Sequence, residues 1–308
     1  MTSDQLKAIY KEAVMAVVNT NIGASVAQAA LAKNERALGA AMEQLSTGKR
    51  INAAGDDASG LAISARMTSQ IRGLETSVRN ANDAISMVDT AEGALDEITE
   101  MLQRIRELAV QSGTGTTSHD DRQYLDAEFN ALRDEIERIA TNTEWNGRAI
   151  LDGGAGGATG VSGVTFQVGV DGGQTLAVDF GSFNNSTGGA MNGLGSTNGG
   201  IGLASTVGAT QASGIAMAST VIGLTDTAIA AVSNQRASFG AASNRLTHAV
   251  DNLTSVKTNA EASRSRILDT DYAAATSELA RTQIIQQAGT AMLAQANQLP
   301  QSVLSLLQ

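Results

Sequence analysis

Residue types that could take part in catalysis are scarce in this sequence. The cluster of titratable residues at 119–121 is explained more simply as the start of a helix. The chain holds two histidines and no cysteine. His119 precedes Asp120 and Asp121, an arrangement that could transfer a proton. Acidic residues at the start of a helix also interact favourably with the helix dipole and cap free backbone amides. We interpret the cluster as a helix start, and His248 as an ordinary residue of a later helix.

Motifs for metals, phosphates and nucleotides are incomplete. The pair Asp56-Asp57 lacks the ladder of oxygen ligands that a calcium loop needs, so we interpret it as a turn or helix cap. Gly48-Lys49 resembles a phosphate loop, but Glu43 stands where that motif needs glycine and Arg50 where it needs Ser or Thr. The sequence therefore predicts no catalytic residue, no metal site and no cofactor, and a protein that is not an enzyme.

Composition narrows the classes of partner. Aromatic residues make up only 3% of the chain, which favours long helices packed through Ala, Leu, Ile and Val. The formal charge of −10 argues against nucleic acid, whose phosphates need clustered Lys and Arg. The N-terminus shows no basic start followed by an apolar run, so we expect no cleavable secretory signal. We also expect no membrane span, taking the amide-rich segment 284–307 as the most apolar stretch.

The elements that would position functional groups are long helices in both halves of the chain. Residues 16–150 and 219–308 are poor in glycine, and large apolar residues recur there every three or four positions. The N-terminal stripes comprise Ile98, Met101, Leu102, Ile105 and Leu108, and then Leu125, Phe129, Leu132, Ile136 and Ile139. The C-terminal seam comprises Phe239, Ala242, Leu246, Ala249, Leu253, Val256 and Ala260. Because a heptad seam needs a partner helix, we expect the two halves to pair as antiparallel coiled coils.

The central segment has a different pattern. Val164, Phe166, Val168 and Val170 alternate with other residues, and the pattern resumes after Asp171-Gly172-Gly173. This predicts a β-hairpin near residues 164–180. Residues 181–218 are mostly Gly, Ser, Thr, Asn and Ala, and we expect a variable surface loop there.

Both ends of the chain are almost uncharged. Residues 16–34 carry only Lys33, and residues 272–308 only Glu278 and Arg281. Surface helices of monomeric proteins carry more charge, so we expect these ends to order on association with other copies. The predicted assembly residues are Ile22, Val26, Leu31, Ile285, Met292, Leu299 and Leu304.

Segments in both halves resemble the bacterial flagellins. The segment 50–64, which reads Arg-Ile-Asn-Ala-Ala-Gly-Asp-Asp-Ala-Ser-Gly-Leu-Ala-Ile-Ser, looks like the N-terminal signature of that family. Further similar segments are 18–21, 79–83, 92–95, 102–112, 142–147, 263–272, 286–289, 293–297 and 302–307. The resemblance implies an exported, extracellular structural subunit that polymerises into the flagellar filament for swimming motility.

The resemblance also implies a division of the chain into domains. Residues 15–55 with 270–308 would form a terminal domain in the filament core. Residues 56–180 with 219–269 would form a rod-like helical domain, and 181–218 the variable loop. Because the family start resembles Met15 onward, residues 1–14 are expected to be an N-terminal extension.

The partners implied by the resemblance are further copies of the chain, an export chaperone, the type III export apparatus, and cap and hook-associated junction proteins. Arg104, Leu108 and Glu128 resemble positions through which many flagellins contact the host flagellin-sensing Toll-like receptor. Contacts within the filament are the alternative role for these three residues.

Other functions stay open at the level of sequence. A hook–filament junction protein would share paired terminal helices. A surface-displayed adhesin or polysaccharide-binding homologue would use the Ser- and Thr-rich loop. An embedded enzyme would have to work with two histidines and no cysteine.

Overall fold

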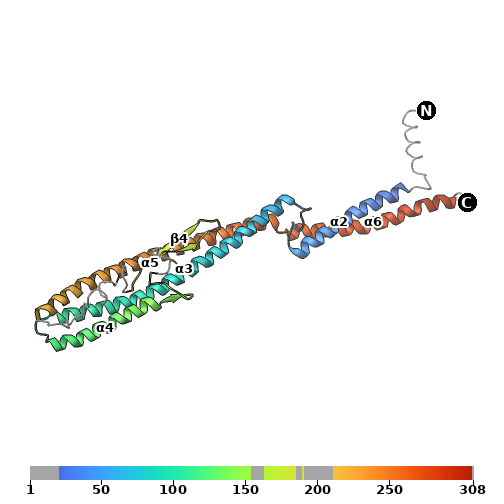
Figure 1. Cartoon of the computed structure of the whole chain (residues 1–308). Coiled ribbons are helices and arrows are strands. Elements are labelled where there is room, and N and C mark those ends of the chain that lie inside the picture. Colours follow the sequence, from blue (N-terminus) through green and yellow to red (C-terminus); the bar gives the residue numbers. More distant parts are fainter. Residues whose placement is uncertain (1–20, 154–162, 185–188, 191–210, 307–308) are drawn as a thin grey trace. The chain divides into compact units, whose positions relative to one another are not determined.

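The computed structural model describes residues 21–153, 163–184, 189–190 and 211–306, with the side chains of 211–213 and 299–306 left out. The predicted extension over residues 1–14 lies outside the described residues. Within them the fold is mainly helical, as the sequence predicts (Figure 1). The helices are α2 (Ile22–Thr47), α3 (Ala58–Ser112), α4 (His119–Asn142), α5 (Gln211–Leu268) and α6 (Tyr272–Leu306).

Two small antiparallel sheets complete the described fold. Strands β1 (Glu144–Trp145) and β2 (Arg148–Ala149) form a short hairpin. Strands β3 (Gly163–Gln167) and β4 (Thr175–Asp179) form the predicted longer hairpin. The predicted loop over 181–218 needs correction, because α5 already begins at Gln211. The first residues of α5 include several alanines, which favour a helix. They lack a stripe of large apolar side chains, so the spacing analysis did not detect the start of the helix.

The chain divides into two compact units. Unit 1 comprises residues 1–69 and 260–308, and unit 2 comprises residues 70–259. The divisions fall inside α3 and α5, whereas the sequence placed them near residues 55 and 270. Each unit is described separately below.

In unit 1, α2 and α6 lie side by side and run antiparallel (Figure 1). Helix α2 ends at Gly48, whose φ of 69° is a left-handed conformation that favours glycine. A side chain there would also meet the Tyr272 hydroxyl, 3.1 Å from an added Cβ. The following segment is tied to the end of α5, because the Arg50 amide donates to Leu268 O and the Thr270 amide to Gly48 O.

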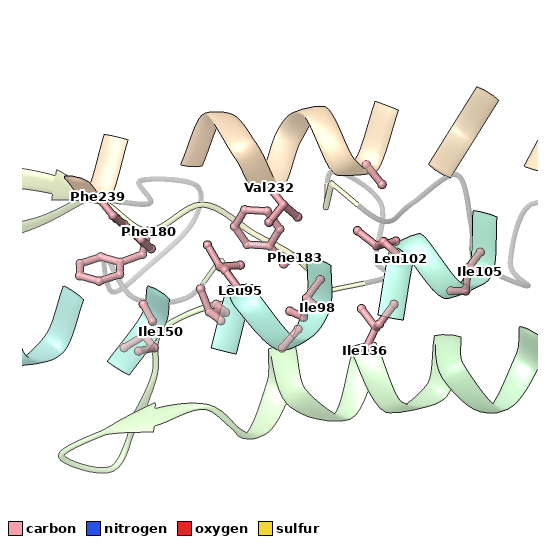
Figure 2. Packing of buried hydrophobic residues seen from close by; sticks show 14 of the residues in the cluster. Leu95, Ile98, Leu102, Ile105, Ile136, Ile150, Phe180, Phe183, Val232 and Phe239 are labelled. Carbon is pink, nitrogen blue, oxygen red and sulfur yellow. The ribbon is translucent and has the colours of Figure 1, made fainter. Parts of the chain in front are cut away.

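Unit 2 contains the main hydrophobic core, built from α3, α4 and α5. The α3 stripe of Leu95, Ile98, Leu102 and Ile105 points between the other two helices, as Figure 2 shows. Phe180, from the segment after β4, packs against Phe239 of α5 with ring centroids 5.3 Å apart. The core thus combines aliphatic helix stripes with a few rings from the hairpin region.

The hairpin β3–β4 is fixed to both long helices of unit 2 by side-chain amides. Asn80 of α3 donates to Gln167 O at 3.1 Å, and Gln235 of α5 donates to Asp179 O at 2.5 Å. Leu176 and Phe166 of the hairpin pack in a second cluster with Ala81, Ala84 and Leu246. The hairpin therefore closes the core between α3 and α5.

Helix α4 starts where the acidic cluster predicted. The Ser118 side chain accepts from the Asp121 amide, and the Asp121 carboxylate accepts from the Ser118 amide, which is a reciprocal capping box. The Ser118 hydroxyl also donates to Asp121 Oδ2 at 2.7 Å, and this bond, followed by the one from the Ser118 amide, holds the pKa of Asp121 below its ordinary value. His119 Nε2 lies 3.2 Å from Gln123 Nε2, one helix turn further along α4.

The expectation that residues 284–307 form the most apolar stretch was wrong, because helix α5 is more apolar. It contains an 18-residue window of mean hydropathy 1.7, so the most apolar stretch lies here and not in 284–307. By length and composition alone α5 could cross a membrane. Its buried residues Ala218, Val221, Ala228 and Val232 instead pack in the core with α3 and α4. We interpret α5 as a core helix.

Candidate assembly surface

The contact between α2 and α6 is made mainly by alanines and leucines, with two amides reaching across it. Asn34, which is 8% exposed, donates from Nδ2 to Thr282 O at 2.7 Å. Asn21 donates from Nδ2 to Ala296 O at 2.8 Å. Between these two contacts Leu31 lies over Gly289, where an added Cβ would stand 3.2 Å from Leu31 Cδ1. Glycine at position 289 therefore leaves room for the Leu31 side chain to lie against the backbone of α6.

The outer faces of this pair expose large apolar side chains. Of the predicted assembly residues, Ile22 is 55% exposed, Val26 64%, Ile285 43% and Met292 66%. Leu31 is half-buried in the pair, and the side chains of Leu299 and Leu304 lie outside the described residues. Met42 and Ile284 are exposed as well, although the sequence analysis did not select them. Exposed apolar surface in segments that carry little charge, here residues 16–34 and 272–308, favours contact with another protein surface.

Charge is distributed unevenly between the units. Unit 1 has ten acidic and ten basic residues, whereas unit 2 has twenty-one acidic and eleven basic residues. The whole formal charge of −10 therefore belongs to unit 2. Unit 1 can approach a second unit 1 without net electrostatic repulsion.

In unit 2, Arg104 and Glu128 join α3 to α4 at the surface. Arg104 Nε lies 2.8 Å from Glu128 Oε1, and Arg104 Nη1 lies 3.0 Å from Glu107 Oε2. These hydrogen bonds, first to Glu107 and then to Glu128, raise the pKa of Arg104. Leu108 must be corrected as a contact residue, because it is 1% exposed and packs in the core.

The predicted seam residues lie at different depths. Phe239, Leu246, Phe129 and Ile136 are buried, and Leu125 and Leu132 pack partly buried against the main cluster. Leu253 is half-buried. Val256 must be corrected, because it is 46% exposed. The half-buried position of that turn is Lys257, whose aliphatic stem can cover apolar surface while its charge stays near water.

Sequence reasoning missed Asn21 and Asn34 as contact residues. A search for apolar spacing passes over asparagine, although Asn34 sits at a position spaced three and four residues from Leu31 and Leu38. That spacing could have indicated a polar residue within a seam, a known means of fixing helix register.

Near the α2–α3 connection, carboxylates bind backbone amides rather than a ligand. Asp56 Oδ2 accepts from the amides of Ala53 and Asn52, and Asp57 Oδ1 accepts from the Gly60 amide. These bonds lower the pKa of both carboxylates. Asp57 therefore caps α3, in line with the sequence interpretation.

Comparison with known proteins agrees with this arrangement. The family model of the bacterial flagellin N-terminal helical region matches residues 18–155, and that of the C-terminal helical region matches residues 222–307. A flagellin from Bacillus subtilis is 42% identical over 94% of this chain and 99% of its own length. A flagellin from Halalkalibacterium halodurans is 41% identical over 95% of this chain and 100% of its own length.

A solved structure gives the fold alone. A flagellar hook-associated protein from Vibrio parahaemolyticus superposes with a TM-score of 0.53 at 16% identity, covering 70% of this chain and all of that one. Both helical regions match in order, and relatives of more than 40% identity align along nearly their whole length. This chain therefore belongs to the bacterial flagellins, the family of structural subunits that build the flagellar filament.

Proposed function

We propose that this chain polymerises through the α2–α6 pair of unit 1 into the flagellar filament outside the cell. The observation that carries the proposal is the exposure of Ile22, Val26, Ile285 and Met292 within the nearly uncharged segments 16–34 and 272–308. Burying one such side chain is worth about 1.5–3 kcal/mol, so several per subunit can hold a polymer together.

The form of the polymer follows from the kind of contact. The apolar side chains lie on two different helices, so one copy can present one face while its neighbour presents another. Contacts between different faces need not close into a ring, and they propagate as a helical filament.

Assembly can be tested with single substitutions on the α2–α6 pair. We expect Ile285→Ser and Val26→Ser each to raise the critical concentration for salt-induced filaments roughly tenfold or more, since each removes about 1.5 kcal/mol or more of burial. Sedimentation and electron microscopy measure this. The control is Val170→Ser in the hairpin turn of unit 2, where removing an apolar side chain that is 38% exposed should leave the critical concentration nearly unchanged. Equal effects at all three positions would contradict the proposal.

The wider role rests on family membership. We propose that the chain is exported by the flagellar type III apparatus without a cleavable signal, with an export chaperone, and meets cap and junction proteins at the filament ends. We propose that it carries no catalytic activity. A junction-type or adhesin function is not favoured by the flagellin relatives at 41% and 42% identity.

Receptor contact remains a second proposal for unit 2. Arg104 and Glu128 are available at the surface, while Leu108 contributes only by supporting α3 from within. Arg104→Ala with Glu128→Ala should weaken signalling by the flagellin-sensing Toll-like receptor without changing helicity. Unchanged signalling by well-folded protein would remove these residues from the role.

A further inference from the structure

The Asn21 side chain uses both ends of its amide. Its Oδ1 accepts from the Ala24 amide at 2.9 Å, which caps the start of α2. Its Nδ2 donates to Ala296 O of α6 at 2.8 Å. Asp and Ser also cap helices well, but Asp has no donor and Ser is too short to hold both partners. Asparagine is thus the cap residue that can also reach the neighbouring helix.

The acceptor on α6 is an unusual carbonyl. In a helix, the carbonyl of residue 296 would accept from the amide of residue 300. Residue 300 is proline, which has no amide hydrogen, and it is the only proline in the chain. Helix α6 continues through this position to Leu306. Ala296 O therefore lacks the usual donor four residues on in its own helix, and Asn21 supplies one from α2.

Apart from the Asn34 contact with Thr282 O, the remaining positions do little to select one register. These positions are filled mostly by small or aliphatic residues, namely Ala24, Leu31, Leu38 and Ala41 on α2 and Ala275, Leu279, Leu293 and Ala296 on α6. Moving one helix along the other by seven residues, about 10 Å, would again place such residues opposite each other. Ordinary helix carbonyls repeat along α6, but the carbonyl freed by Pro300 does not.

We propose that Pro300 and Asn21 act together as a register lock for the terminal helix pair. Pro300 removes the usual helical donor to Ala296 O, and Asn21 binds this carbonyl only when α2 and α6 are aligned as observed. The Asn34 contact with Thr282 O holds the middle of the pair. This inference rests on the proposed function in one respect: the register decides which apolar side chains the pair presents to neighbouring copies.

Because the chain has no cysteine, a pair of spin labels can report the register directly. Ser25→Cys on α2 and Ser277→Cys on α6 are exposed, and each exchanges only oxygen for sulfur. Double electron–electron resonance gives the distance distribution in the soluble subunit and in filaments diluted with unlabelled chain. We expect one narrow distance in filaments of the labelled but otherwise unaltered chain, where association orders these helices.

The test is a double-mutant cycle. Asn21→Asp keeps the cap but removes the donor, and should raise the fraction of molecules outside the main distance by about fivefold to tenfold, the factor expected for one hydrogen bond. Molecules slipped by one heptad would be displaced by about 10 Å along the helix axis. Pro300→Ala restores the helical donor to Ala296 O, so in that background Asn21→Asp should have little further effect. Asn297→Asp, the same change at an exposed site on α6, is the matched control.

Each outcome decides the inference. An unchanged narrow distance in Asn21→Asp would overturn it, and so would an equal effect of Asn21→Asp with and without Pro300. A broad distribution in the unaltered chain, in both subunit and filament, would show that no lock exists. Loss of filaments in the Val26→Ser and Ile285→Ser variants is measured separately by sedimentation, so failure of the lock and failure of the assembly proposal are distinguishable.

Discussion

Units 1 and 2 bury their side chains in different ways. Among the described residues of unit 1, only three hydrophobic residues are buried, namely Ala41, Ile51 and Ala275. The described part of unit 2 buries four phenylalanine rings and an aliphatic stripe on α3 that is fully enclosed by α4 and α5. Unit 1 is electrically neutral, and unit 2 carries the entire net charge.

This difference separates two sources of stability. A three-layered helical core stabilises unit 2 within a single chain, because its large side chains are already removed from water. A pair of helices leaves much of its apolar surface in water, so unit 1 gains stability when copies associate.

Removing a core ring should destabilise the soluble subunit strongly. Phe239→Ala deletes a fully buried ring that packs on Phe180, and we expect a loss of about 3–5 kcal/mol in the free energy of unfolding. Urea unfolding followed by circular dichroism measures it. Ile285→Ala in unit 1 should change this free energy by less than about 0.5 kcal/mol. Similar losses for both variants would erase the distinction between the units.

The turn between α3 and α4 depends on a buried guanidinium. Arg122 is 3% exposed and donates to Ser112 O at 2.9 Å and Thr114 O at 3.1 Å. Arg122→Met keeps the side-chain length but leaves these carbonyls without that donor, so we expect unit 2 to lose about 1–3 kcal/mol. The control Arg138→Met removes an exposed arginine from α4 and should leave the unfolding curve unchanged.

The cap of α4 should contribute less. Ser118→Ala removes the hydroxyl that accepts from the Asp121 amide, and we expect a loss of about 1 kcal/mol from unit 2. Ser86→Ala makes the same chemical change inside α3, where the hydroxyl bonds only to the preceding turn. That control should not destabilise the protein. A loss confined to Ser86→Ala would contradict the capping role.

Acid should affect unit 1 mildly through its α2–α3 connection. The pKa values of Asp56 and Asp57 are lowered from the ordinary 3.8 by backbone amides. A carboxylate with a lowered pKa contributes stability above its unfolded value of 3.8, and this contribution is lost as the pH falls through the lower folded value. In a thermal unfolding series from pH 6 to pH 3, the double variant Asp56→Asn, Asp57→Asn should show a shallower acid dependence. Unchanged acid dependence would exclude the two carboxylates as its source.

Much of unit 2 could be predicted from the sequence because large side chains mark its core. The stripe on α3, the ring at Phe239 and the capping box at Ser118 each follow from residue type and spacing. Beyond Leu246, the heptad spacing predicted an inward side chain at Val256. In the structure Val256 is exposed and the half-buried side chain of that turn is Lys257. A search for apolar residues does not select lysine, although the aliphatic part of the lysine side chain is suited to a half-buried site.

Unit 1 was less predictable for a physical reason. Its contact face mixes leucines with alanines, and its most specific contacts run from amides to backbone carbonyls. Backbone acceptors leave no mark in a sequence, except where a proline removes the usual donor. Asn21 and Pro300 are 279 positions apart, so local patterns could not connect them.

The uneven charge also determines how whole filaments would behave toward one another. A polymer of this chain adds ten negative charges for every subunit and is therefore a strong polyelectrolyte surrounded by counterions. Repulsion between such filaments reaches only about 8 Å in physiological salt, far enough to oppose close lateral contact. Near pH 4.7, where the chain carries no net charge, this repulsion disappears and dispersed filaments would gather into bundles.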